Sequence, residues 1–100
     1  MERLALSKLL RNILGTGNVY FQPPENVKIK YPCIVYNLSG KEKKYANNAA
    51  YIKRTQYSLT VIDTDPDSPI HERVSDLPHC SFDRAYVSDN LNHWVYNIFI

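Results

Sequence analysis

The sequence predicts an α+β domain in which a mainly antiparallel sheet of about four strands carries an N-terminal helix and a second short helix between two hairpins. Three observations predict this class: apolar residues at helical spacing in the first segment, β-forming segments through the rest of the chain, and helix-start and helix-stop residues between the two pairs of strands. A chain of 100 residues can build one modest core, so we expect a single domain over 1–100.

The first segment, ERLALSKLLRNILGTG, predicts an amphipathic helix. Its apolar residues recur at helical spacing with charged residues between them, at Leu6, Leu9, Leu10, Ile13 and Leu14. Gly15 follows where helices commonly end, because glycine adopts the left-handed conformation of a helix cap without steric cost. We therefore expect one face of this helix to pack against a core or a partner.

The segment after the helix contains β-forming residues interrupted by prolines. Pro23, Pro24 and Pro32 remove backbone donors and restrict the chain, so we expect a short strand at 18–22 and then an irregular extended crossing. CIVYNLS, residues 33–39, predicts a regular strand.

A second strand, IKRTQYSLTVID, follows after the polar stretch GKEKKYANNAA. Tyr57, Leu59 and Val61 alternate along it and therefore share one face. We interpret the polar stretch as a long loop, which makes the pair a hairpin with an elaborated tip.

Residues 64–78 predict the second, short helix. Ser68 or Asp67 is suited to its N-cap, Pro69 to its first helical position and Pro78 to its end. Its apolar side would consist of Ile70, Val74 and Leu77.

The remaining chain predicts two strands, CSFDRAYV and HWVYNIFI, joined by the five-residue loop SDNLN. Regular alternation places Phe82 and Tyr86 on one side of the first strand. In the second strand the shared side carries Trp94, Tyr96, Ile98 and Ile100.

Charge is unevenly distributed along the chain, although the net charge is only +2. Residues 28–54 hold seven cations and one anion, a net +6, whereas residues 63–89 hold seven acids and two arginines, a net −5. If these segments form different faces, copies of the chain can bind head to tail. Mixed, solvated faces explain the same composition, and charge alone does not choose between the two.

Residues 77–94, LPHCSFDRAYVSDNLNHW, contain the residue types of hydrolases and zinc sites. However, His79 and His93 have no nucleophile elbow or glycine-lined oxyanion hole near them in the sequence. Structural zinc requires paired ligands two to four residues apart, whereas His79 and Cys80 are adjacent and His93 is solitary. We therefore expect no catalytic residue and no metal ligand.

Asp63, Asp65 and Asp67 alternate like the start of a calcium loop. Such a loop needs glycine at its sixth position and glutamate at its twelfth, and these positions hold Ser68 and Val74. Helix capping explains the acids instead. The GTG sequence at 15–17 follows a helix rather than preceding one, so it is no phosphate cradle, and we expect no cofactor.

Cys33 and Cys80 make one disulfide arithmetically possible. Both lie in or at the start of predicted strands, which favours free, buried thiols and leaves the disulfide as the alternative. The longest apolar runs are far shorter than the roughly 18 residues that span a bilayer, so we expect no membrane partner. The first segment also lacks the pattern of a secretory signal, which predicts an intracellularly made product.

The basic hairpin tip is the most informative polar feature. Elaborated loops on rigid sheets are where binding residues concentrate, and lysines interleaved with tyrosines can contact phosphates, nucleic acid or an acidic protein surface. Simple solvation of a lysine-rich loop is the equally weighted alternative. The candidate contact residues are Lys41, Lys43, Lys44, Tyr45, Tyr51, Lys53 and Arg54.

Three stretches, KYPCIVYN, KYANNAAYIKRTQYSLTVIDTDPDSPI and LPHCSFDRAYVSDNLNHWVYNIFI, together resemble the tail-completion or tail-terminator proteins of long-tailed bacteriophages. The likeness covers about residues 28–100 and contains no catalytic signature. It implies an α+β subunit of a hexameric ring that caps the tail tube and receives the head-side connector. It implies no enzyme activity and no cofactor. It also implies that the protein is located in the virion after assembly in the bacterial cytoplasm.

The resemblance also implies that the tip from Lys41 to Arg54 reaches toward the ring lumen or the tube, a position that permits weak contacts with passing DNA. We therefore expect a non-enzymatic, structural virion protein. Another neck protein, such as a head-closure or adaptor subunit, is the nearest alternative. A stand-alone nucleic-acid-binding module that uses the basic hairpin is the alternative from a different class, and a small hydrolase follows both.

Overall fold

The structure is a computed structural model that describes residues 2–46 and 49–100, with side chains described outside 42–53. The elements follow in the order expected from the sequence, which confirms the α+β class. They are α1 (Arg3–Leu14), β1 (Val19–Phe21), β2 (Cys33–Ala46), β3 (Ala49–Asp63), α2 (Ile70–Ser75), β4 (Cys80–Ser88) and β5 (Leu91–Phe99).

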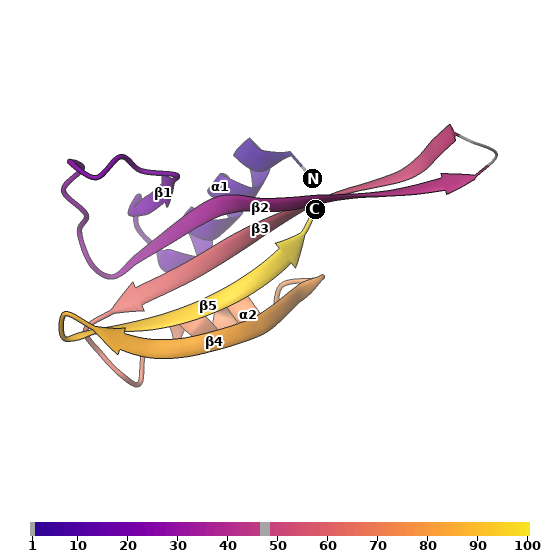
Figure 1. Cartoon of the computed structure of the whole chain (residues 1–100). Helices are drawn as coiled ribbons and strands as arrows, with labels where there is room; N and C mark the ends of the chain where they lie inside the picture. Colours follow the sequence, from indigo (N-terminus) through magenta and orange to yellow (C-terminus); the bar gives the residue numbers. More distant parts are fainter. Residues whose placement is uncertain (1, 47–48) are drawn as a thin grey trace.

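The described strands form one sheet of five in the order β1-β2-β3-β5-β4. The expected count of about four is therefore one too low, because β1 joins the sheet, and the sheet is mixed, because β1 runs parallel to β2. β3 pairs antiparallel with β5, and β5 with β4, so the second hairpin extends the first across the β3–β5 contact. This connection leaves β4 at one edge of the sheet and β1 at the other (Figure 1).

Both helices cover the same face of the sheet (Figure 1), and the core lies between the helices and that face. The apolar residues predicted for one face of β3 and of the last strand point to it, which confirms Tyr57, Leu59 and Val61 on β3 and the series from Trp94 on β5 to Ile100 just after it. The core residues are Leu6, Leu10, Leu14, Val19, Ile34, Tyr36, Tyr57, Leu59, Val61, Ile70, Val74, Tyr96 and Ile98.

A polar contact inside this core attaches α1 to β2. The Tyr36 ring is fully buried, and its hydroxyl hydrogen-bonds the hydroxyl of Ser7, which is also buried. Arg3 donates to the same tyrosine oxygen at 3.3 Å and holds its guanidinium carbon 4.4 Å from the centre of the Phe21 ring. A buried hydroxyl without a hydrogen-bond partner costs free energy, so this contact fixes the position of α1 on β2.

α1 ends where the sequence predicts, whereas α2 begins and ends elsewhere. Gly15 has a φ of 83° and donates its N–H to the Arg11 carbonyl at 2.9 Å, so it ends α1. α2 begins one residue later than predicted, because Pro69 is its N-cap and not its first helical residue, although the hydroxyl of Ser68 accepts the Ile70 N–H at 3.4 Å. It ends at Ser75, so Leu77 lies beyond the helix and packs against the core from there.

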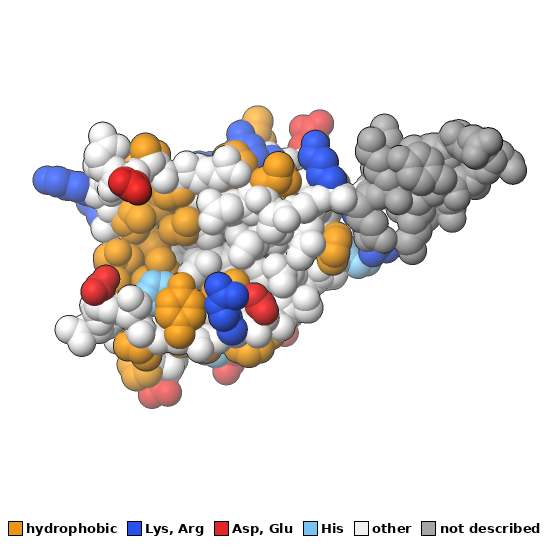
Figure 2. Space-filling model, in the orientation of Figure 1, with side chains coloured by type: hydrophobic (Ala, Val, Ile, Leu, Met, Phe, Trp, Pro, Cys, Tyr) orange, Lys and Arg blue, Asp and Glu red, His pale blue; other side chains and the backbone are white. Residues whose placement is uncertain are grey.

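The opposite face of the sheet has no helix over it and is mostly polar along its centre (Figure 2). We call it the open face. Strand alternation places Asn37, Ser58, Thr60 and Asn97 there, between the core-facing positions of β2, β3 and β5. Three buried apolar residues that do not belong to the core cluster, Cys33, Ile62 and Val95, lie on the same face.

Two predicted loops are strands in the structure. The polar stretch at 40–50 was expected to be a long loop, but β2 and β3 stay paired through it, as far as Ala46 opposite Ala49. The loop expected at 88–92 shortens to Asp89 and Asn90, with Ser88 paired to Leu91. Their φ values of 52° and 63° are those of a hairpin turn that matches the twist of the strands, and Asp and Asn tolerate this conformation.

The expectation that Phe82 and Tyr86 share one side of their strand is wrong. The register of β4 against β5 shifts between Phe82 and Arg84, so Asp83 is an extra residue, a β-bulge. Phe82 packs against Tyr96 on the helix side, whereas Tyr86 stacks on His93 on the open face. An extra residue reverses the alternation beyond it, and composition gives no sign of where it falls.

We predict unequal effects of two leucine truncations in α1. Leu10→Ala should lower the free energy of unfolding by about 2–5 kcal/mol, because Leu10 has no exposed surface and its loss leaves a cavity. Leu4→Ala is the matched control: Leu4 is 67% exposed, and its removal should change stability by less than about 0.5 kcal/mol. Urea unfolding measures both, and equal losses would contradict the seating of α1.

Candidate interaction site

The most prominent feature of the molecule is the two-stranded extension of β2 and β3, which projects beyond the rest of the sheet (Figure 1). β1 pairs with β2 only from Ile34 to Tyr36. β5 pairs with β3 as far as Gln56, and Ile100 just after β5 exchanges two backbone hydrogen bonds with Thr55. Beyond these positions the two strands pair with each other and, in the described residues, with no third strand. We call residues 41–46 and 49–54 the ribbon.

All seven candidate contact residues lie on the ribbon. Lys41 and Arg54 are exposed at its base, where Lys41 is opposite Thr55 and Arg54 is opposite Glu42. The side chains of the other five candidates, Lys43, Lys44, Tyr45, Tyr51 and Lys53, lie outside the described residues. The backbone register nevertheless sets Lys43 opposite Lys53, so the cationic positions of the two strands come together in one narrow element.

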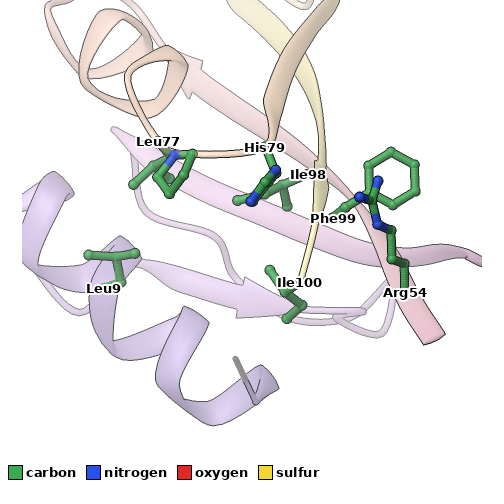
Figure 3. Close-up of a pocket in the computed structure, with 8 residues that line it drawn as sticks. Leu9, Arg54, Leu77, His79, Ile98, Phe99 and Ile100 are labelled. Atoms are coloured by element: carbon green, nitrogen blue, oxygen red, sulfur yellow. The ribbon is translucent and has the colours of Figure 1, made fainter. Parts of the chain in front are cut away.

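A pocket of about 290 Å³ lies where the ribbon joins the body (Figure 3). Its wall is mainly apolar and comes from α1, the connection between α2 and β4, and the end of β5: Leu9, Leu77, Pro78, His79, Ile98, Phe99 and Ile100, with Arg54 at the side of the ribbon. The guanidinium carbon of Arg54 is 5.8 Å from the centre of the Phe99 ring. Arg54 therefore links the ribbon to the body.

β4 is the second exposed feature, because nothing pairs with its outer edge in the described residues. Every residue from Ser81 to Ser88 is exposed. Large apolar side chains are among them: Phe82 is 58% exposed, Tyr86 42% and Val87 69%. Sequence reasoning assigned this strand no binding role, because its alternating pattern does not show that it is outermost.

The three histidines lie in separate places. His71 on α2 stacks on Trp94, with ring centres 4.5 Å apart, and His93 stacks on Tyr86 at 4.6 Å. His79 precedes β4 with a φ of 60°, and its carbonyl accepts the Phe99 N–H at 3.2 Å. Among the described residues, no three His, Cys, Asp or Glu side chains are grouped as metal ligands.

Both cysteines are free. β3 and β5 lie between the strands that carry Cys33 and Cys80, so the strand spacing alone separates them by about 14 Å, well beyond disulfide reach. Burial, with the negative charge of Asp63 adding to it, raises the pKa of the Cys33 thiol from 9.0 to about 12. Burial likewise raises the pKa of Cys80 to about 11, so both thiols are protonated and weakly nucleophilic at neutral pH.

The three alternating aspartates shape a turn. A carboxylate oxygen of Asp63 accepts the Asp65 N–H at 3.1 Å, and one of Asp65 accepts the Asp67 N–H at 2.9 Å. These local bonds lead the chain from β3 into α2. No helix within the described residues combines the length and the apolar character that crossing a bilayer requires.

The fold places the ribbon apart from most of the exposed acids. The cationic ribbon extends from β2 and β3, whereas exposed acids lie on and around α2 and β4, at the edge of the sheet beyond β5. These acids are Asp65, Asp67, Glu72, Asp76, Asp83 and Asp89. The ribbon and the acidic edge are therefore separate surfaces, whereas Lys28 and Lys30 lie outside the ribbon, before the end of β2 that pairs with the end of β3.

Comparison of the chain with models of protein families, with curated proteins and with solved structures found no match.

We predict that alkali weakens the fold through Cys33. Its pKa is raised in the folded state, so its contribution is intact below about pH 9 and is lost as the pH rises toward 12. Urea unfolding from pH 8 to 11 should show a steeper loss of stability in the wild type than in Cys33→Ala, which lacks the thiol. Parallel pH profiles would contradict the assignment of this effect to Cys33.

Proposed function

We propose that the chain is a structural virion protein of a long-tailed bacteriophage, a tail terminator that acts as a homo-oligomeric ring. In this proposal six copies close a ring, one face of which caps the tail-tube protein while the other receives the head-side connector. The protein works by binding, without catalysis or cofactor. The sequence resemblance supports the identity of the assembly, and the geometry supports the mode of binding.

The projecting ribbon is the observation that carries the proposal. A two-stranded ribbon without a third strand or a packed face has little independent stability in water. A protein that extends such an element away from its core gains stability when the ribbon packs on a neighbour. The ribbon is therefore the element expected to reach another subunit or the tube.

The separation of charge indicates how copies meet. A cationic ribbon on one subunit and an acidic edge around α2 and β4 on another are complementary surfaces of different kinds. Contacts between two different surfaces are heterologous, and they close into a ring when the rotation between neighbours divides a full turn. A ring built in this way has two distinct faces, as a joint between tube and head requires.

Nucleic-acid binding is the second candidate function, and the charge of the ribbon favours it. Residues 41–54 hold Lys41, Lys43, Lys44, Lys53 and Arg54 against Glu42 alone. Lysines on a narrow two-stranded element can approach phosphates, and in the proposed ring they would contact passing DNA weakly. Another neck subunit is the remaining alternative within the virion, and association with tail tubes distinguishes it.

We predict that the purified protein forms rings of several subunits, visible by negative-stain microscopy and measured by light scattering. Lys41→Glu/Lys43→Glu/Lys44→Glu should shift it to smaller species, because it places anions where the acidic edge of a neighbour would bind. The matched control is Lys8→Glu/Lys28→Glu/Lys30→Glu, which makes the same charge change at exposed residues outside the ribbon. A wild type that stays monomeric at high concentration, and that does not bind tail tubes, contradicts the proposal.

We predict that any affinity for DNA is weak and falls steeply between 50 and 200 mM salt, because phosphate contacts release counterions. Fluorescence anisotropy with a labelled duplex measures it, with the same two triple variants. Tight binding that the ribbon variant abolishes, by a protein that forms no ring, would favour the nucleic-acid-binding module over the tail terminator.

A further inference from the structure

β4 ends the sheet with a long, exposed and partly apolar edge. Soluble proteins usually shorten, cover or charge such strands, because their unpaired backbone groups attract other strands. Here the strand is nine residues long, and three large apolar side chains on it are exposed. The opposite edge is β1, which has only three residues.

The bulge in β4 produces an unusual pattern of side-chain directions. Cys80 and Phe82 face the helix side, opposite Ile98 and Tyr96 of the core. Beyond the bulge Ala85 and Val87 face that side too, because Ala85 is opposite Trp94, which packs on the core, and Val87 lies two positions further.

The open face of β4 carries the remaining side chains. Tyr86 stacks on His93 there, and the guanidinium carbon of Arg84 is 5.9 Å from the centre of the Tyr86 ring. Asp83 pairs with Arg84 at 3.2 Å, so both charges lie on this face. Ser81 is opposite Asn97, a position of the open face.

This pattern is symmetric about the step from Asp83 to Arg84. Going away from that step in either direction, successive side chains point to the open face, the helix side, the open face and the helix side. A regular strand is symmetric about each of its residues but never about the step between two neighbours, because neighbouring side chains lie on opposite faces. Antiparallel pairing of the strand with its own copy therefore matches every side chain to one on the same face, provided that Asp83 is opposite Arg84 of the second copy.

We propose that two copies of the chain join edge to edge through β4 in this register, related by a two-fold axis between Asp83 and Arg84. Phe82 is then opposite Ala85 of the second copy, Ser81 opposite Tyr86, and Cys80 opposite Val87. The two sheets become one continuous sheet with all helices on one side. The contact covers the exposed apolar side chains of β4 and pairs its free backbone groups.

Charge favours a second copy of the chain as the partner. In this register Asp83 of each copy meets Arg84 of the other, which gives two cross-strand pairs of opposite charge. A shift by one residue brings Arg84 against Arg84, or Asp83 against Asp83, and turns apolar side chains toward the polar face. A regular strand of another protein cannot match the side-chain faces of β4 on both sides of the bulge. The bulge therefore favours a second copy of this chain over other partners.

This inference goes beyond the proposed function. A two-fold contact pairs identical surfaces and closes after two copies, so it differs from the heterologous contact that continues around a polar ring. The two-fold contact forms in the free protein and covers the acidic edge until the ring contact replaces it. The two contacts also respond oppositely to one change: Arg84→Glu makes the edge more acidic, which favours a cationic ribbon and disfavours the pairing of β4 with itself.

The test is sedimentation equilibrium of the full chain, with the ribbon variant Lys41→Glu/Lys43→Glu/Lys44→Glu as background to remove ring contacts. We expect a monomer–dimer equilibrium that Arg84→Glu weakens about tenfold or more, because two attractive pairs become repulsive. Asp83→Arg/Arg84→Asp should restore the dimer, because the register again sets opposite charges together. Lys8→Glu is the charge-matched control and should leave the equilibrium unchanged.

A second measurement reports the register directly. Val87→Cys places a new thiol opposite the native Cys80 of the second copy, so oxidation by diamide, which takes up two electrons and two protons per disulfide, should give a covalent dimer. Ser88→Cys is the control, one position out of register and on the other face. A strictly monomeric protein, a dimer insensitive to both charge variants, or equal cross-linking of the two cysteine variants would overturn the proposal.

Discussion

The antiparallel pairing of β2 and β3 is the constraint on which the rest of the structure depends. It runs from Cys33 opposite Ile62 to Ala46 opposite Ala49, and the other strands attach at its inner end. There β1 and β5 extend it into a sheet, and α1 and α2 cover one face over the buried aliphatic and aromatic residues. At its outer end the same pairing continues with no third strand beside it among the residues that the structure describes. The β2–β3 pair thus forms part of the core at one end and part of the surface at the other.

This arrangement divides the molecule into a stable body and two surfaces suited to contact. Hydrophobic burial between the helices and the sheet stabilises the body, and the Ser7–Tyr36 hydrogen bond fixes the position of α1 on the sheet. The ribbon extends the cationic segment away from the body, and β4 presents an unpaired edge beside exposed acids. Both surfaces follow from strand order, since a strand is exposed only when no neighbour takes its outer edge.

The proposed ring and the proposed two-fold contact use these surfaces in different ways. A ribbon that meets an acidic edge is a contact between unlike surfaces and can repeat around a ring. β4 that meets β4 is a contact between like surfaces and ends with two copies. Cys33 takes part in neither contact, because its thiol is buried. His71 and His93 stack on Trp94 and Tyr86.

The sequence by itself determined the class of the fold, the order of its elements, the cap at Gly15, and the core-facing sides of α1, β3 and β5, because periodicity and capping are local properties of a chain. It also located the cationic segment. Only the tertiary structure decided that this segment is a paired ribbon, that β1 joins in parallel, that β4 is outermost, and that an extra residue at Asp83 turns Phe82 and Tyr86 to opposite faces. Those outcomes depend on which strands lie side by side and in which register. Contacts between residues far apart in the chain decide the neighbouring strands and their register. The local sequence pattern does not contain this information.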